Sequence, residues 1–472
     1  MIVHRRLQRS FGDGFVTGEV ADLWEPWMRH ADEVLNDPNL LDLIQQELAK
    51  RCKKSRTRGR PVTTAEVALR LLLLKHIRDY SYAALIREVR ANLVYREFTR
   101  VGGGPVPDDK TIARIARQLG PEVIDQIHQR VVDMAREHKA VSGRKMRVDT
   151  TVTETNIHYP TDSSLLGDGV RVLTRLMNKV TDVVGEVGTR LRDRTRSIRH
   201  RILEIGRASR DKSEKGKAKL QTAYGRLLAA TGRVVGQAKK FSTEIATRVK
   251  VKWGTGLVLK KAKAQLDEMI PRLEQVIRQT RQRVMGGDTR AEGKLVSVFE
   301  IQTEVIRKGK AGKPTEFGKL VKIQEAENQI VTHYEVFDQR PSDSQLLTPS
   351  LEWHIEQFGR APEVVAADAG FFSAANEAKA EELGVKRVAV PSQSTKSEQR
   401  KRKQKQRWFK KAQKWRTGSE GRISVLKRRH GLGRSRYKGQ QGMKRWVGLG
   451  VIADNLINLG GYLVKSRKPA RA

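Results

Sequence analysis

Three carboxylates, far apart in the sequence, stand where acidic residues are uncommon. Asp149 lies within RVDTTVTET, a stretch rich in β-branched residues, and acids are depleted in strands. Asp368 ends the apolar segment EVVAAD, and Glu420 lies within the strongly basic stretch 416–438. Three carboxylates without Cys or His form a hard-oxygen ligand set, which suits Mg²⁺ or Mn²⁺. Two such ions, about 3.5–4 Å apart, would clamp the attacking and leaving oxygens of a phosphoryl displacement.

Each of these acids also has a purely structural interpretation. Asp368 could cap the helix that follows its strand, and Glu420 could pair with Arg416 four residues earlier. Asp149 is harder to explain in this way, because it lies inside a strand. Other acids compete, although the segments TDSS and GDG are typical of caps and turns: Glu154, Asp162 and Asp168. The order strand-Asp, strand-Asp, helix-Glu is more specific than any one of its members.

The segments around these acids predict a mixed α/β sheet flanked by helices. RKMRVDTTVTETNIHYP and SVFEIQTEVI read as strands, and EFGKLVKIQ with QIVTHYEVF predicts a hairpin. Strand EVVAAD, helix SAANEAKAEELG and strand VKRVAVP follow the order typical of parallel pairing. The carboxyl ends of such strands converge on a crevice, so we expect Asp149 and Asp368 to meet there. A helix crossing the sheet would bring Glu420 to the same place.

Basic side chains surround the third acid. In a helix, Arg416, Glu420 and Lys427 share one face. The run 396–414 before it is dense in Lys and Arg and contains Trp408 and Phe409. A charge run is usually a solvated loop, but aromatic side chains among the charges favour nucleic acid, because bases stack on them. We expect DNA contacts from Arg400, Arg402, Lys403, Arg407, Trp408, Lys410, Lys411, Trp415, Arg416, Arg422 and Lys427.

Residues 1–140 predict a separate helical domain. Thr63 and Glu66 read as a capping box before one helix, and a second helix is expected from Tyr82 to Phe98. After the break VGGGPVP, Asp108 caps the short helix DKTIARIARQL. This order resembles a helix-turn-helix, whose outer side would touch DNA through Lys110, Thr111, Arg114 and Arg117. A plain helical bundle with a solvated basic face explains the same pattern.

Long basic amphipathic helices interrupt the predicted sheet. Residues 141–168 would form the first part of the α/β core, 169–292 a helical insertion, 293–460 the remainder of the core and 461–472 a basic tail. Breaks near SRDKSEKGK and KWGTG predict three helices in the insertion. DNA binding, dimerisation and a purely structural spacer all suit such an arm.

Composition bounds the class of protein. The chain has 472 residues and 93 Lys and Arg against 53 Asp and Glu, a formal net charge of +40, which favours a polyanionic partner such as nucleic acid. A basic protein that only binds ribosomal RNA is an alternative. Cys52 is the one cysteine, which excludes an intrachain disulfide and a Cys-based zinc site. We find no signal peptide and no apolar run of about 18 residues, so we expect a cytoplasmic protein without a membrane span.

These segments together resemble the bacterial insertion-sequence transposases that carry a DDE triad on an RNase H-like core, most closely the ISNCY group. The resemblance rests on LLLLKHIRDYSYAALIREVRANLVYREF, DDKTIARI, VDTTVTETNIHYPTDSSLL, VVAADAGFF and RTGSEGRISVLKRRHGLGRSRYKG. Related enzymes have a Tyr-Arg-Glu-Lys signature around the last acid. Arg416, Glu420 and Lys427 match its spacing, whereas Gln413 stands where the Tyr is expected. The large insertion also lies earlier in the chain than in many relatives, which place it before the Glu.

The resemblance implies a DNA transposase that cuts the ends of its element and joins the 3′-hydroxyl ends to target DNA. Asp149, Asp368 and Glu420 would then hold two Mg²⁺ or Mn²⁺ ions, while Arg416 and Lys427 steady phosphates. Its partners would be double-stranded DNA, as terminal inverted repeats and as target, and a second copy of the chain at synapsis, in the bacterial nucleoid. Two alternatives are a structure-selective, Mg²⁺-dependent nuclease on the same core and an inactive transposase that acts as a DNA-binding repressor.

Overall fold

The computed structural model of the chain describes residues 5, 20, 22–50, 63–185, 190–248, 256–307, 314–393 and 395–466. The chain divides into two compact units, one of residues 1–156 with 306–472 and one of residues 157–305. The second unit therefore begins before and ends after the insertion expected at 169–292. Cys52 and the basic segment 51–61 lie outside the described residues, as does the end of the basic tail.

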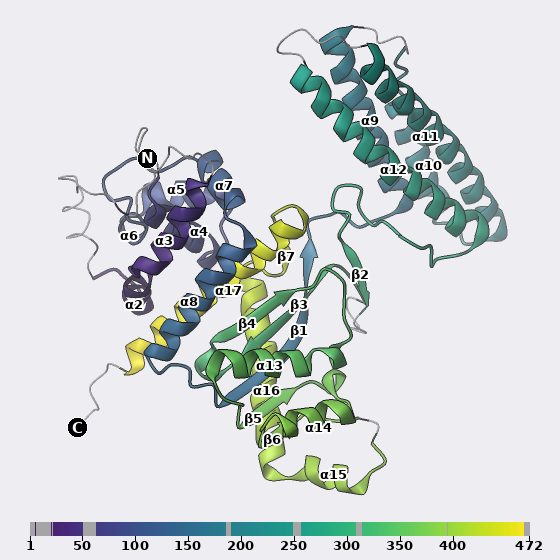
Figure 1. The fold of residues 1–472 in the computed structure, drawn as a ribbon. Helices are drawn as coiled ribbons and strands as arrows, with labels where there is room; N and C mark the ends of the chain where they lie inside the picture. The colour runs from purple at the N-terminus through teal and green to yellow at the C-terminus, as the bar shows by residue number, and fades with distance from the viewer. Residues whose placement is uncertain are drawn as a thin grey trace. The chain divides into compact units, whose positions relative to one another are not determined.

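A mixed sheet forms the centre of the first unit (Figure 1). Its strands follow the order β2-β3-β1-β5-β6, with β4 beside β3 and β7 beside β1. The strands are β1 Lys145–Thr155, β2 Glu304–Arg307, β3 Thr315–Glu325, β4 Val331–Val336, β5 Val364–Ala367, β6 Arg387–Ala389 and β7 Arg434–Ser435. β3 is antiparallel to both β1 and β4, whereas β5 runs parallel to β1 and β6. The predicted hairpin and the predicted parallel pairing are both confirmed.

The strand expected at SVFEIQTEVI is mostly absent, because only its last residues pair in β2. The hydroxyl of Ser297 accepts hydrogen bonds from the backbone N–H groups of Phe299 and Glu300. A side chain that binds its own following backbone offers these N–H groups an alternative to a sheet ladder.

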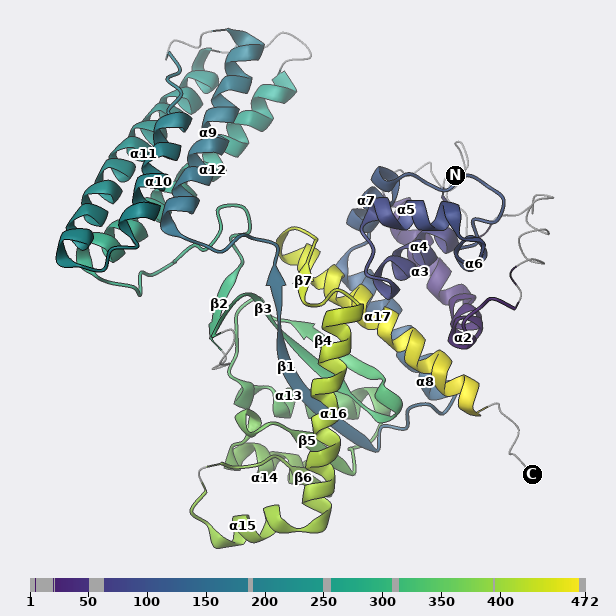
Figure 2. The same ribbon diagram turned by 180° about the vertical axis from the view of Figure 1, so that it is seen from behind.

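Helices cover both faces of the sheet. On one face, α13 (Leu347–Phe358) and α14 (Ala374–Glu382) pack on a cluster that contains Met146 and Val148 of β1. On the other face, Phe409 and Ala412 of α16 (Arg407–Arg429) pack against Ala366 of β5. Figure 2 shows α16 running across that face, with α15 (Glu398–Lys405) beside its first turn. This crossing positions the helix that carries Glu420.

The N-terminal residues form the expected helices, with differences in detail. They are α2 Pro26–Leu35, α3 Pro38–Ala49, α4 Ala65–Ile77, α5 Tyr82–Ala91, α6 Leu93–Phe98, α7 Asp109–Gln118 and α8 Pro121–Glu137. Thr64 rather than Thr63 caps α4, its side chain accepting from the N–H of Val67. The helix expected from Tyr82 to Phe98 divides at Asn92, whose side chain accepts from the N–H of Tyr95 and so begins α6. The cap predicted at Asp108 is confirmed.

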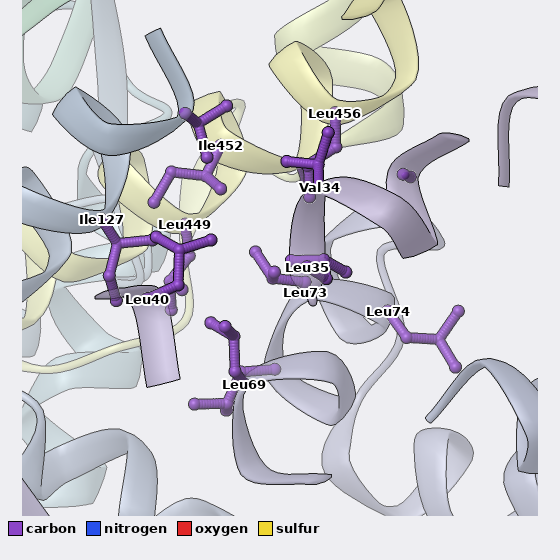
Figure 3. Close-up of a cluster of buried hydrophobic side chains, with 14 of the residues drawn as sticks. Val34, Leu35, Leu40, Leu69, Leu73, Leu74, Ile127, Leu449, Ile452 and Leu456 are labelled. Carbon is purple, nitrogen blue, oxygen red and sulfur yellow. The ribbon is translucent and has the colours of Figure 1, made fainter. Parts of the chain in front are cut away.

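The last helix, α17 (Gly439–Ser466), belongs to the core of the N-terminal helices. Leu449, Ile452 and Leu456 of α17 pack with side chains of α2, α3, α4 and α8 (Figure 3). The N-terminal helices therefore share one core with a segment that the sequence assigned to the α/β core. By length and composition α17 could also cross a membrane, unlike any run noted in the sequence, but 72% of its apolar window is buried in the protein. Its burial is that of a core helix.

In the described part of the second unit, four helices form a bundle, whereas the sequence predicted three; Figure 1 shows the helices side by side. They are α9 Asp162–Val184, α10 Thr195–Ala208, α11 Glu214–Arg248 and α12 Gly256–Gly286. The additional break follows α9, at Gly185, whose φ of 76° favours glycine. Thr161 caps α9, so the TDSS segment begins this helix, in agreement with its expected capping role. The bundle has a hydrophobic core of its own.

Candidate active site and nucleic-acid interface

Sheet register places the first two acids side by side. β1 and β5 are parallel, and Val148 is the Cα partner of Ala367. Asp149 and Asp368 are the next residues on the two strands. Neighbouring strands lie about 4.7–4.9 Å apart, and residues at one level project to the same side of the sheet. The register therefore brings together two acids that are more than 200 residues apart in the sequence.

Contacts from α16 show which side of the sheet this is. Arg147, two residues before Asp149, donates to the backbone oxygen of Trp415. Since side chains alternate along a strand, Asp149 faces the same helix. The hydroxyl of Ser419 donates to Oδ2 of Asp149 at 3.1 Å. Asp149 thus contacts the turn of α16 that contains Glu420.

One guanidinium joins the first and third acids. Arg416 Nη2 lies 3.0 Å from Oε1 of Glu420, and its Nη1 lies 3.9 Å from Oδ2 of Asp149. Glu420 is 61% exposed, whereas Asp149 is 14% exposed. The i−4 pair that was the structural interpretation of Glu420 is present, and the same arginine connects this acid to Asp149.

Asp368 lies at the strand end and also acts as a cap. Its Oδ1 accepts from the N–H of Ala369 at 2.6 Å, which begins the short helix η4 (Ala369–Phe371). The structural and the functional interpretations of Asp368 are compatible, because one carboxylate oxygen suffices for the cap.

The donor set suits a divalent cation, although the acids do not converge on one point. Within the described ranges, no three His, Cys, Asp or Glu side chains lie close enough together to hold a metal ion. Asp149 and Asp368 are adjacent by register, and both offer only oxygen. Glu420 is the outlying member, on an exposed side of α16.

Two arginines of the expected DNA-contacting set are structural, which corrects the sequence interpretation. Arg422 is buried, with Nη1 2.6 Å from Oδ1 of Asp454 on α17. Arg400 is buried too, paired with Glu377 and donating to the backbone oxygen of Val390. A charge run does not reveal which of its members turn inward, and both of these satisfy buried oxygens.

The remainder of the basic run divides between exposed and packed side chains. Lys403 pairs with Glu377 and Glu381. Trp408 and Trp415 are half-buried against the sheet, and the Arg147 guanidinium lies 5.0 Å from the centre of the Trp415 ring. Four expected contacts are exposed on α15 and the start of α16: Arg402, Arg407, Lys410 and Lys411.

Gln413 and Lys427 have specific positions on α16. The amide of Gln413 donates to the backbone oxygens of Ala367 and Ala389, at the ends of β5 and β6. Gln413 therefore connects α16 to the end of the strand beside Asp368. The sequence gave no indication of this role. Lys427 lies 4.0 Å from Oε1 of Glu316 on β3, two turns beyond Glu420.

The second basic surface lies on α7. Lys110, Arg114 and Arg117 are exposed, and Thr111 is half-exposed, as expected of the outer side. A cleft of about 480 Å³ lies between α3 and α7, lined by Glu47, Lys50, Arg114, Arg117 and Gln118. Lys50 was not predicted; its place at the end of α3, before a basic segment, is the signal that could have found it.

Two family models match parts of the first unit. Residues 27–118 match a family model described as a transposase domain (DUF772), and residues 377–460 match one described as a transposase DDE domain. The chain is a DNA transposase of the DDE type. The DDE match includes Glu420, while Asp149 and Asp368 precede it. No curated protein and no solved structure matches significantly.

The two matches cover different segments of the first unit of the transposase. The DUF772 match spans α2 to α7 and ends on the basic surface of α7. The DDE match spans α14 to α17 and includes the basic run and the helix with Arg416 and Glu420. Neither match includes the four-helix bundle.

Proposed function

We propose that this transposase cuts at the ends of its element and joins the resulting 3′-hydroxyl ends to target DNA, with Asp149, Asp368 and Glu420 as the catalytic acids. The observation that carries the proposal is the register Val148 to Ala367, since it sets two of the acids next to each other under the helix of the third. The mixed sheet with parallel β1, β5 and β6 and antiparallel β3 and β4 suits an RNase H-like core.

Asp149, Asp368 and Glu420 would hold two Mg²⁺ or Mn²⁺ ions, which when bound supply charge neutralisation at the phosphate and activation of the attacking hydroxyl. The hydroxyl of Ser419 donates to the carboxylate of Asp149, so this ligand would already be oriented before a metal ion binds. Glu420 is tied only to the neighbouring Arg416 in the described contacts and is the ligand that turns toward the site. Arg416, 15% exposed, remains beside both acids to bind a phosphate oxygen.

DNA would approach along the cationic side chains already described. Exposed Arg407, Lys410 and Lys411 belong to α16, which packs on the face of the sheet toward which Asp149 projects. On α7, Lys110, Arg114 and Arg117 are exposed. We assign terminal-repeat binding to α7 and phosphate contacts near the scissile bond to the basic run. Because two element ends must be joined, a dimer is expected at synapsis. Membership of the ISNCY group and action at the nucleoid belong to the same proposal.

The direct test uses Asp149→Asn, Asp368→Asn and Glu420→Gln, with Glu154→Gln as the matched control. Glu154 lies on the same strand as Asp149 and pairs with Arg434, so its substitution removes an acid without touching the site. We expect the three site variants to lose cleavage of element-end duplexes and to bind the same DNA normally, because cations supply the affinity. A site variant that nicks at the wild-type rate would remove its residue from the proposal.

An assay of strand transfer distinguishes a transposase from a nuclease built on the same core. Pre-cleaved element ends are incubated with plasmid target and Mg²⁺, and covalent joining of the 3′ ends is measured. Cutting without joining would favour the nuclease, and binding that yields no product with any divalent ion would favour the repressor. Inverted repeats bracketed by short direct duplications around the reading frame would support the proposal independently.

A further inference from the structure

The four-helix bundle of residues 157–305 carries a cationic surface that the proposed site does not use. α10 turns Ile198 and Ile205 toward the core of the bundle. Arg196, Arg199 and Arg207 are exposed on the remainder of the helix. Only one acid lies within α10, Glu204, and it already pairs with Arg226 of α11.

Three further arginines gather where α10 begins. Arg192 and Arg194 precede the helix, and Arg233 lies on α11. Partial burial, and then the positive charges of Arg192 and Arg233, lower the pKa of Arg194. Asp193 between them accepts from the N–H of Thr195 at 2.7 Å. In the part of the chain that the structure describes, these three arginines form no ion pair with an acid.

This crowding is unfavourable in the protein alone. Like charges near one another repel, and cations at a helix N-terminus oppose the helix dipole, where acids are the stabilising residues. The first turn of α10 contains no acid. An external polyanion would relieve both effects.

We propose that this α10 surface binds the phosphate backbone of double-stranded DNA, independently of the catalytic acids. The surface consists of Arg192, Arg194, Arg196, Arg199, Arg207 and Arg233. It rests on the chain's being a DNA-acting protein but not on which residues catalyse cleavage.

The dimensions and chemistry of the surface favour a duplex. Arg196 and Arg207 are eleven positions apart on one helix, about 16 Å at 1.5 Å per residue, so the cations form a line rather than a pocket for one ion. Guanidinium groups bind phosphate through two parallel hydrogen bonds. α10 contains no Phe, Tyr or Trp, so it lacks the large aromatic side chains on which single-stranded bases typically stack. Leu203 is the one exposed large apolar side chain of α10, which is too little for insertion into a membrane.

The test compares two triple variants of the full chain that lose the same charge. The first is Arg192→Gln with Arg194→Gln and Arg233→Gln. The control is Arg171→Gln with Lys217→Gln and Lys263→Gln, three cations of the same bundle that are already paired, with Asp168, Glu214 and Asp267. The affinity for a random-sequence duplex of about 30 base pairs is measured from 50 to 200 mM salt.

We expect the first variant to lower the slope of log K against log salt by up to about 2.7, at about 0.9 per lost phosphate contact, and the control to lower it much less. An unchanged slope, or equal losses in both variants, would overturn the proposal. Equal weakening on phosphatidylserine vesicles with no effect on DNA would assign the surface to anionic lipid instead.

Two additional measurements keep the outcome decisive. Thermal unfolding of the first variant should occur at the wild-type temperature or above it, because repulsion has been removed. If that variant does not fold, the corresponding triple Arg→Lys variant keeps the charge and should retain most of the salt slope; a lost slope there would refute backbone binding. Asp149→Asn should leave the slope unchanged, so failure of the catalytic proposal and failure of this one are distinguishable.

Discussion

Replacement of Lys75 by Met should stabilise the transposase, and by an amount that depends on pH. Lys75 lies on α4 and is 2% exposed. Its Nζ lies 4.3 Å from the ring centre of Trp446, 5.2 Å from that of Tyr82 and 5.4 Å from that of Tyr437. It has no hydrogen-bond partner among the described residues. Burial, and then the charge of Arg436, lower the pKa of Lys75 from 10.5 to about 7.

The pH dependence of the stability follows from the number of protons that Lys75 binds in the folded and the unfolded state. Between pH 7 and 10.5 the unfolded chain holds a proton on Lys75 that the folded protein has mostly lost, so this group makes the protein more stable as pH rises through that window. At pH 7 the shift costs about 4 kcal/mol relative to a group without one, and at pH 9 about 2 kcal/mol. Methionine has a similar shape and no charge, so Lys75→Met should recover much of this cost, less the contacts with the rings.

The assay is the free energy of unfolding in urea at pH 7 and at pH 9, for wild type, Lys75→Met and the control Lys465→Met. Lys465 is exposed at the end of α17, so its substitution should change little at either pH. We expect the advantage of Lys75→Met to fall by roughly 2 kcal/mol between pH 7 and pH 9. An advantage that is the same at both pH values would show that Lys75 does not titrate in this range in the folded state.

Two other substitutions test the packing of α17. Arg445→Gln should cost about 1–3 kcal/mol in urea unfolding and weaken binding to element-end DNA, because Nη1 of Arg445 donates to three backbone oxygens at the end of α7; a wild-type midpoint would show that these bonds contribute nothing. Gly448→Ala should cost about 1–3 kcal/mol, since the added methyl would meet Tyr334 and Ile124. Its control is Gly461→Ala, where nothing lies within 4 Å and stability should rise or stay the same. Equal effects of the two glycine variants would contradict the close packing.

Local signals in the sequence predicted the elements well where the cause is local. The cap at Asp108 and the hairpin of β3 and β4 depend on residues close together in the chain. Asn92 separates α5 from α6, which the sequence had predicted as one helix. Gly185 ends α9, a break that was missing when three helices were predicted for the insertion. Both are residue types that end helices, so these breaks were visible in principle.

The pairings that depend on distant residues were not available from the sequence. Arg400 and Arg422 look like the exposed cations beside them, and only the tertiary structure shows that Glu377 and Asp454 hold them inside. The packing of α17 on the N-terminal helices has the same origin. For the site, residue types suggested which acids to consider, but the adjacency of Asp149 and Asp368 is a property of strand register.

α17 contacts the helices of both proposed functional surfaces of the first unit. Asp454 of α17 holds Arg422 on the helix that carries Glu420. About two and a half turns earlier on α17, Arg445 binds the carbonyl end of α7, whose exposed side carries the proposed terminal-repeat contacts. Both helices therefore contact the buried helix α17, and within this unit α17 sets the distance between α7, the proposed DNA-binding helix, and α16, which carries the proposed catalytic acid Glu420. A substitution that loosens α17 should consequently impair DNA binding and cleavage together, whereas substitution of the proposed catalytic acids should impair cleavage alone.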